Sequence, residues 1–211
     1  MSEAFCPPDD RAASAAPWDD MADYEIPRFS KREIVAAGRA LAGTITTADS
    51  AALEVFRIAH NWRSAHVYPM RRLRMELTRT ARKVHGGAIT AARLKRMSSI
   101  RRKMRTTNLT LYQLQDIGGC RVVFESTAEV ERLLALYRAG ASRHTVNREW
   151  DYITNPKPDG YRSIHLVFKF NGEDREAVYN RQTIEMQIRT KLQHSWATAV
   201  EVTLPLGINP G

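Results

Sequence analysis

Cysteine is scarce in this chain, because only Cys6 and Cys120 occur among its 211 residues. The first lies in a polar N-terminal stretch and the second lies inside an apolar run. Two cysteines cannot supply the ligands of a zinc site or build a disulfide framework. We therefore expect Cys120 to be a small core residue.

Long apolar segments are also lacking, since no run approaches the roughly 20 residues that a membrane span needs. Residues 1–20 are acidic and contain proline, unlike a signal peptide. These features predict a soluble, cytoplasmic protein with no membrane partner. The common glycine-rich phosphate-binding fingerprints are absent as well, so any nucleotide site must be built from side chains.

Acidic residues are few outside the N-terminus. The net charge is +9, and residues 1–25 hold seven acids and one base, so the remainder carries +9 − (−6) = +15. Residues 71–105 contain thirteen Lys or Arg and a single acid, Glu76. Such a surplus favours polyanionic partners such as nucleotides or nucleic acid, although a solvated face is the plainer interpretation.

The length and the 43% hydrophobic content fit one well-cored domain with appendages. Residues 1–28 lack periodicity and read as a flexible acidic tail. We expect the domain itself to cover residues 29–211, with a helical part at 29–110 and a sheet-containing catalytic part at 111–203.

Helical periodicity dominates the first half of the chain. Ser30 and Glu33 form a capping box that predicts a helix over residues 31–41, ended by Gly43. A second helix begins at Asp49 or Ser50 and runs toward a break before Pro69. Further helices are predicted over residues 70–84, 100–105 and 129–138, the shortest opened by the pair at 98–99 and the last capped by Ser126.

The period changes from 3.6 to 2 at Gly119, which predicts strands in the second half. We expect strands at about residues 119–125, 145–153, 164–170 and 183–189, the last two joined as a hairpin through an Asn171–Gly172 turn. A final helix from about Thr190 should turn Leu192 and Trp196 inward. The predicted fold class is α/β (α+β), a mixed sheet of about five strands surrounded by helices.

Alternation places one set of polar side chains on the non-core side of the strands. These are Arg121, His165, Glu185, Gln187 and Arg189, with Asp116 just before the first of them. Two carboxylates in a strongly positive region suit a divalent cation, and oxygen ligands beside phosphate favour Mg²⁺. The alternative is that Asp116 and Glu185 each pair with an arginine for structural reasons.

The stretch at residues 155–165 has a composition that core packing does not explain. Two prolines and a glycine stiffen it as a loop that presents Lys157, Asp159 and Tyr161. An exposed tyrosine ring on a rigid loop is a stacking platform for a base. A half-buried packing tyrosine is the competing interpretation.

Four ordered motifs extend this pattern: RLKRMSSIRRKM at 93–104, DIGGCRVVF at 116–124, PKPDGYRSIH at 156–165 and EMQIRT at 185–190. Together they resemble the synthetase domain of RelA/SpoT-type alarmone synthetases. The segments NWRSAH at 61–66 and HSWATAVE at 194–201 resemble the short stand-alone branch, which includes small alarmone synthetases and toxic synthetases. The resemblance implies a nucleotidyltransferase-like synthetase fold.

It also implies a pyrophosphokinase that moves the β,γ-pyrophosphate of ATP to the ribose 3′-hydroxyl of GDP or GTP, making (p)ppGpp-type alarmones with Mg²⁺ as cofactor. Asp116 and Glu185 would be the catalytic and metal-binding residues. The residues implied to bind ATP are Arg93, Lys95, Ser99, Lys103 and Arg121. Those implied to bind the acceptor are Lys157, Asp159, Tyr161, His165, Gln187 and Arg189.

Two other functions stay open. Some short members transfer pyrophosphate to the 3′-terminal adenosine of tRNA, and the basic domain suits that acceptor. A non-catalytic nucleic-acid-binding module is the second alternative. No His-Asp dipeptide occurs, so the metal motif of the family's hydrolase domain is missing, and the resemblance then implies an outside antitoxin protein or hydrolase as a partner.

Overall fold

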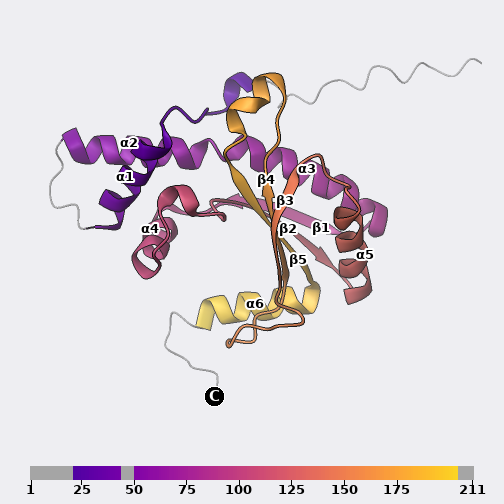
Figure 1. The fold of residues 1–211 in the computed structure, drawn as a ribbon. Helices are drawn as coiled ribbons and strands as arrows, with labels where there is room; N and C mark the ends of the chain where they lie inside the picture. The colour runs from indigo at the N-terminus through magenta and orange to yellow at the C-terminus, as the bar shows by residue number, and fades with distance from the viewer. Residues whose placement is uncertain (1–20, 44–49, 204–211) are drawn as a thin grey trace, which may run out of the picture.

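The structure is a computed structural model that describes residues 21–43 and 50–203. Its centre is a five-stranded sheet in the order β1-β2-β5-β4-β3. The parallel pair is β2–β5, and the other neighbouring strands are antiparallel. This confirms the predicted mixed sheet with helices around it (Figure 1). The strands are β1 (Ile89–Leu94), β2 (Gly118–Phe124), β3 (Thr145–Asp151), β4 (Ile164–Lys169) and β5 (Thr183–Thr190).

Six α-helices and three short 3₁₀ helices surround the sheet in the described ranges. The α-helices are α1 (Lys31–Ala42), α2 (Ser50–Ser64), α3 (Val67–Val84), α4 (Met97–Thr106), α5 (Thr127–Arg138) and α6 (Lys191–Thr203). The 3₁₀ helices are η1 (Met21–Asp23), η2 (Leu111–Gln113) and η3 (Asp174–Tyr179). The capping box expected at Ser30 is present, the expected cap Ser126 forms a capping box with Glu129, and Gly43 ends α1 as predicted.

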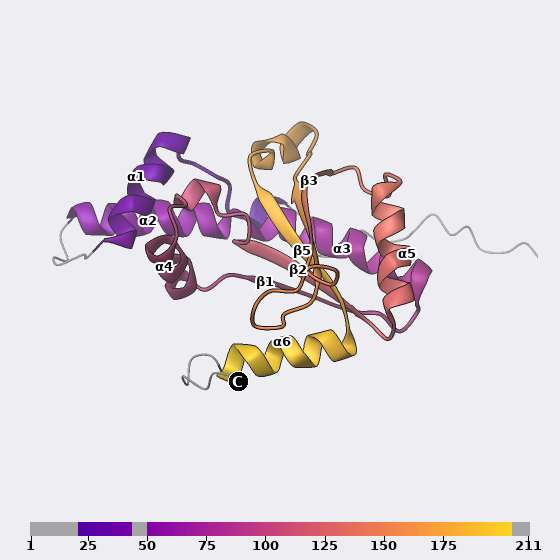
Figure 2. The same ribbon diagram turned by 60° about the horizontal axis from the view of Figure 1, so that its bottom comes forward.

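One face of the sheet is fully covered. Leu73 and Leu77 of α3 and Leu133 of α5 pack against alternate strand residues, among them Val122 and Met186. A second apolar cluster joins α1, α2, α4 and η2. Figure 2 shows α3 on one side of the sheet and α6 on the other. The side of the sheet opposite α3 and α5 is therefore left for polar side chains.

Three elements differ from expectation. Strand β1 lies within residues 29–110, which were expected to be helical, because its partly exposed residues on an edge strand give no clear alternation. Helix α3 begins at Val67 and includes Pro69, which is tolerated since the amides of a first helical turn have no intrahelical partner. Helix α4 likewise begins at Met97 rather than at residue 100.

The C-terminal half holds two further differences. Strands β4 and β5 pair antiparallel as predicted, but η3 lies between them, so Asn171 and Gly172 do not form a two-residue hairpin turn. Helix α6 is rotated from the expected orientation: Leu192 is 81% exposed and Trp196 47%, whereas Ala197 is buried. A single short amphipathic helix with apolar residues on two sides does not specify which side packs.

The expected tail begins to pack before residue 29, because Met21 and Tyr24 lie against the main core. The remainder of that tail, the alternative cap Asp49 and the chain after residue 203 lie outside the described residues. Cys120 is buried with a free thiol, as expected. Among the described helices, none has the length and apolar character that crossing a membrane requires.

Candidate active site

The uncovered side of the sheet forms the wall of a cavity of about 750 Å³. Register explains why its polar residues converge. Glu185 on β5 lies opposite Gly119 on β2, and Gln187 lies between Arg121 on β2 and His165 on β4. Eleven of the thirteen predicted site residues line this cavity: Arg93, Lys103, Asp116, Arg121, Lys157, Asp159, Tyr161, His165, Glu185, Gln187 and Arg189.

The two remaining predicted residues are placed differently. Lys95 lines an adjoining cavity of about 230 Å³ that shares Arg93, Asp116 and Glu185 with the larger one. Ser99 lies half-buried in the first turn of α4 and lines neither cavity. A direct contact of Ser99 with a ligand in the cavity is therefore not apparent from this arrangement.

Asp116 sits between two lysines just ahead of β2. Its Oδ2 accepts hydrogen bonds from Lys95 Nζ at 2.8 Å and Lys103 Nζ at 2.7 Å. Burial favours the protonated acid, but the two ammonium groups outweigh it and lower the pKa of Asp116. The other oxygen, Oδ1, is buried without a hydrogen-bond partner. Asp116 is thus an ionised carboxylate with one oxygen still available.

Glu185 is the second ionised carboxylate. Burial raises its pKa, yet hydrogen bonding to His165 and Gln187 outweighs burial, so the pKa of Glu185 is lowered. His165 Nδ1 lies 2.9 Å from Oε1, and Gln187 Nε2 donates to Oε2 at 2.9 Å. The negative charge of Asp116 opposes this shift, which indicates that the two carboxylates lie close enough to interact.

Gly119 shapes the space between these groups. A Cβ there would meet only the backbone oxygens of Glu185 and Arg93, at 3.8 and 3.9 Å. Because glycine has no side chain, the surface between β1 and β5 stays bare beside the Glu185 carboxylate. A phosphate chain can therefore approach the carboxylates closely at this point.

The loop that follows β3 closes one side of the cavity. Asp159 Oδ1 accepts the Tyr161 amide at 2.9 Å, so this carboxylate caps its own turn. Lys157 Nζ lies 4.9 Å from the centre of the Tyr161 ring and 4.6 Å from that of Tyr152. The Tyr161 hydroxyl lies 2.8 Å from His165 Nε2. Tyr161 is half-buried, with its ring edge in a cluster of aromatic side chains.

His165 is less accessible than expected for a phosphate ligand. It is 7% exposed, and its two ring nitrogens face Glu185 and Tyr161. Since an ionised carboxylate only accepts, His165 donates from Nδ1 to Glu185, and Nε2 accepts from the Tyr161 hydroxyl. Direct contact with an acceptor phosphate requires breaking one of these hydrogen bonds.

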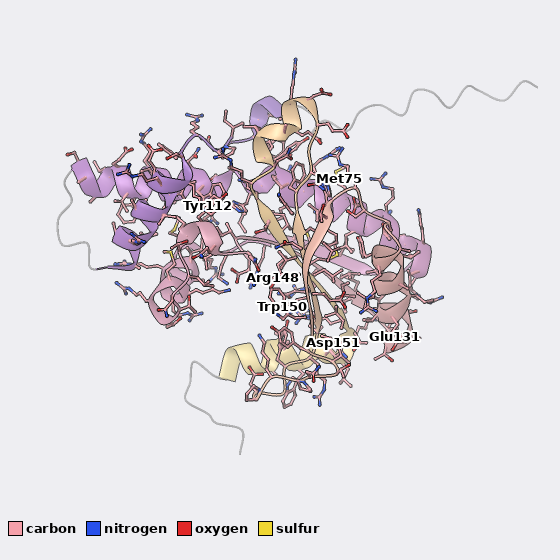
Figure 3. The ribbon with its side chains drawn as sticks, in the orientation of Figure 1. Met75, Tyr112, Glu131, Arg148, Trp150 and Asp151 are labelled. Atoms are coloured by element: carbon pink, nitrogen blue, oxygen red, sulfur yellow. The ribbon has the colours of Figure 1, made fainter. Side chains whose placement is uncertain are left out.

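Several cavity residues were missed at the sequence level. Arg148, Trp150 and Tyr152 line the cavity from β3 and its end, and they alternate along the chain, a signal that period-2 reading could have detected. Trp62 and Tyr112 line the opposite side, stacked with ring centres 5.3 Å apart. Figure 3 shows Tyr112 near α4 and both Arg148 and Trp150 on β3.

The donor set fits Mg²⁺ better than a metal held by the protein alone. In the described residues no group of three or more His, Cys, Asp or Glu side chains gathers around a common point. Mg²⁺ usually takes one or two carboxylates and completes its shell with water and substrate phosphate oxygens. The orphaned Asp116 Oδ1 and the neighbouring Glu185 meet that requirement.

The architecture of this protein is that of the alarmone synthetase fold, as comparison with solved structures shows. The crystal structure of the small alarmone synthetase 1 from Bacillus subtilis matches with a TM-score of 0.55 and 25% identity over 65% of this chain and 75% of that one. The same protein bound to its product pppGpp gives a TM-score of 0.57 and 27% identity, over 67% and 78%. Small alarmone synthetase 2 from Bacillus subtilis, at 22% identity and a TM-score of 0.60 over 72% and 83%, shares the fold.

The chain belongs to the family defined by the region found in RelA / SpoT proteins, whose model matches residues 92–204. The GTP pyrophosphokinase of Escherichia coli (strain K12) is 37% identical over 102 residues, 48% of this chain. That segment spans 12% of the length of the relative. The chain is thus a RelA/SpoT synthetase domain homologous to (p)ppGpp synthetases, as its motifs predicted.

Proposed function

We propose that this protein is an ATP-dependent pyrophosphokinase that makes (p)ppGpp-type alarmones from GDP or GTP. The observation that carries the proposal is the placement of two ionised carboxylates, Asp116 and Glu185, in one cation-lined cavity of about 750 Å³. This cavity is roomy enough for two nucleotides to meet. The printed names of the relatives, a GTP pyrophosphokinase and a synthetase bound to its product pppGpp, support the same reaction.

In the proposed reaction the acceptor's 3′-oxygen attacks the β-phosphorus of ATP. A bond forms between that oxygen and the β-phosphorus, the bond from the β-phosphorus to the α,β-bridging oxygen breaks, and AMP leaves. Such a transfer depends on positioning and charge neutralisation more than on covalent help. The exposed Arg93 and the partly buried Lys103 supply positive charge on the donor side of the cavity.

Glu185 takes the proton of the 3′-hydroxyl in this scheme. Its lowered pKa keeps it ionised near neutral pH, and hydrogen bonds from His165 and Gln187 hold the carboxylate in one orientation. Asp116, with Oδ1 available, and Glu185 are the residues that would hold Mg²⁺. When bound, the ion would supply positive charge beside the phosphates.

The loop at residues 155–165 binds the acceptor. The Tyr161 ring stacks on the base, and the exposed Lys157 contacts the acceptor phosphates. Because His165 is occupied by Glu185 and Tyr161, it contributes by orienting both of them rather than by touching phosphate. Gln187 and Arg189 support the floor of the same subsite.

The test is to incubate the protein with Mg²⁺ and ATP labelled in its γ-phosphate, offering GDP, GTP, ATP and deacylated tRNA in separate reactions. Label on GDP or GTP, with AMP released in equal amount, is the expected result. Transfer to tRNA alone would exclude alarmone synthesis and assign the tRNA-modifying function instead. No transfer, with RNA still retained on a filter, would leave a non-catalytic nucleic-acid-binding module.

We also propose that an antitoxin protein or a hydrolase outside this chain limits the product of the transfer. Overexpression of the active protein should therefore slow growth, and a Glu185→Gln variant should not. Unhindered growth with the active protein would count against the need for an external regulator.

A further inference from the structure

The fold divides the basic stretch at residues 71–105 into two separate surfaces. Arg93, Lys95 and Lys103 line the cavities on one side of the sheet. Helix α3 packs against the opposite side, burying Leu73 and Leu77 at that interface. Its outward residues therefore point away from the candidate active site, and Figure 2 shows α3 and α6 on opposite sides of the sheet. The α3 cations need an explanation independent of nucleotide binding in the cavity.

The outward face of α3 carries charge of one sign. Arg74, Arg79, Arg82 and Lys83 are all exposed, and none forms an ion pair within the described residues. The one acid of the helix, Glu76, is half-buried. An ordinary solvated helix intersperses acids and bases three or four residues apart. Arg79 has Glu76 three residues before it, and its charge opposes the rise in the pKa of that carboxyl caused by burial. On its other side Arg79 has Arg82 and Lys83 three and four residues away, where like charges repel.

Two arginines in the first turns of α3 have partners within the fold. Arg71 Nη1 donates to the Tyr24 hydroxyl at 2.8 Å, and its guanidinium lies over the Tyr24 ring. Arg72 Nε lies 3.2 Å from Glu176 Oε1. Two arginines at the start of α3 thus serve the fold. The four cations that follow, Arg74, Arg79, Arg82 and Lys83, which we call the α3 basic face, form no ion pair of this kind within the described residues.

We propose that the α3 basic face, residues Arg74, Arg79, Arg82 and Lys83, binds the phosphodiester backbone of a nucleic acid strand. Three of the four are arginines, whose planar guanidinium matches phosphate in a two-pronged contact. Arg74, Arg79 and Arg82 follow one another at about 7.5 and 4.5 Å along the helix axis, and Lys83 lies about 1.5 Å beyond Arg82, so the three arginines can contact successive phosphates of one strand. Such contacts favour any sequence equally.

The surface suits a nucleic acid better than a lipid membrane. An amphipathic helix on a membrane needs a row of apolar residues beside its cations. The apolar row of α3 faces the sheet, and Met75, 44% exposed and labelled in Figure 3, is the large apolar residue on the outward side. The exposed edge residue Ile89, on β1, adds a second isolated contact. Neither forms a continuous apolar strip with the other described residues of α3.

The test compares two triple variants that remove the same charge. Arg74→Gln, Arg79→Gln and Arg82→Gln are combined in the first; Arg32→Gln, Arg39→Gln and Arg175→Gln, all exposed and outside the cavity, form the matched control. Fluorescence anisotropy measures binding of labelled single-stranded RNA, single-stranded DNA and duplex RNA of 20 nucleotides. We expect the α3 variant to lose about tenfold or more in affinity at 0.1 M salt and the control less than about threefold.

Salt dependence and activity sharpen the comparison. The slope of log affinity against log salt for a single strand should fall by about 2 in the α3 variant, since each lost phosphate contact contributes about 0.7. An Arg-to-Lys version of the three α3 positions should retain most of the affinity because it keeps the charge. Pyrophosphate transfer to free nucleotides should be unchanged in all of these variants, so the inference stands or falls separately from the proposed function.

The three probes show which kind of nucleic acid binds. A loss of affinity in the α3 variant for any of the probes supports the proposal. Equal binding by the α3 variant and the control overturns it, as does binding to vesicles with anionic phospholipid but to none of the nucleic acids. Matching thermal unfolding midpoints for all variants exclude loss of fold as the cause.

Discussion

Nδ1 of His165 lies 2.9 Å from Oε1 of Glu185, joining neighbouring strands through their side chains. The backbone register pairs His165 with Gln187, so the imidazole reaches diagonally across to the carboxylate. Gln187 holds the second carboxylate oxygen. A half-buried carboxylate that lines the cavity and is held by two donors is oriented in the way that proton abstraction needs.

Replacing Glu185 by Gln should abolish most of the transfer activity. The amide keeps the volume but cannot take a proton, and its NH₂ group would face the NH₂ of Gln187. We expect the rate of pyrophosphate transfer to fall about 10²- to 10⁴-fold, the usual contribution of a positioned base. The matched control is Glu125→Gln, an exposed carboxylate paired with Lys191 outside the cavity. Full activity of the Glu185 variant would refute the assigned role.

Asp116→Asn should separate charge from hydrogen bonding at the donor site. Lys95 and Lys103 would lose their shared counter-charge, and the oxygen that we propose to hold Mg²⁺ would become neutral. We expect the Mg²⁺ concentration needed for half-maximal activity to rise at least about tenfold, because a neutral amide is a weak ligand for Mg²⁺. Measuring transfer across a Mg²⁺ series tests this, with the exposed Asp174→Asn as the control. An unchanged Mg²⁺ dependence would place the ion elsewhere.

Much of the site followed from the sequence because strand alternation is a local property. Glu185, Gln187 and Arg189 alternate with Ile184, Met186 and Ile188, so one face was assignable without knowing the fold. Whether Asp116 and Glu185 meet depends on the parallel pairing of β2 with β5, residues far apart in the chain. Local periodicity does not predict which strands pair. The expectation that Asp116 and Glu185 lie in one site came from the family motifs instead.

The misplaced residues have equally specific causes. Trp62 has the spacing of a core residue in α2 and is 2% exposed, yet it also lines the cavity because the large ring reaches from the core to the cavity wall. Leu192 was expected to face inward and lies 81% exposed, since α6 packs through Ala197 instead. Residue spacing alone does not predict that a side chain contacts both the core and a cavity, nor which side of a weakly packed helix faces inward.

Acidification should destabilise the protein through His66. This histidine is 1% exposed and bonded to the Trp62 carbonyl, and burial lowers its pKa to about 4 from 6.5. The unfolded chain therefore binds a proton below pH 6.5 while the folded chain does not, so stability falls as pH drops from 6.5 toward 4. The contribution is about 2 kcal/mol at pH 5.

Urea unfolding of the protein at pH 7.5 and pH 5.0 measures this loss. His66→Gln should show a smaller difference between the two pH values, by about 2 kcal/mol, whereas the exposed His60→Gln should behave like the parent. An identical pH dependence in all three proteins would show that His66 does not titrate differently on folding.

A buried glycine lets α1 pack closely against η2. A Cβ on Gly38 of α1 would lie 2.6 Å from Cβ of Leu111 and 3.1 Å from its backbone nitrogen. Gly38→Ala should therefore push η2 away and destabilise the fold by about 1–3 kcal/mol, despite the better helix propensity of alanine. Gly86→Ala is the control, since no atom lies within 4 Å of its added Cβ. Thermal unfolding measures both, and equal midpoints would contradict this packing.

Gly160 lies in the loop at residues 155–165, which we propose binds the acceptor, and it is in contact range of Trp196 on α6. Its φ is +76°, and an added Cβ would lie 3.2 Å from Nε1 of Trp196. Gly160→Ala therefore meets two obstacles, a backbone conformation that costs an L-residue about 1–2 kcal/mol and the indole edge. We expect the KM for the acceptor to rise several-fold while the KM for ATP stays unchanged, because the donor residues lie on other elements.

The two obstacles can be told apart with Trp196→Ala. Removing the indole relieves the contact but not the backbone strain, so Gly160→Ala should still impair acceptor binding in that background, though less than in the parent. Trp196→Ala alone should loosen the loop and speed tryptic cleavage after the exposed Arg162. Leu192→Ala, one turn earlier and 81% exposed, should leave cleavage unchanged. Equal cleavage rates in both variants would mean that α6 does not hold the loop, and acceptor specificity would then depend on the loop's own turn.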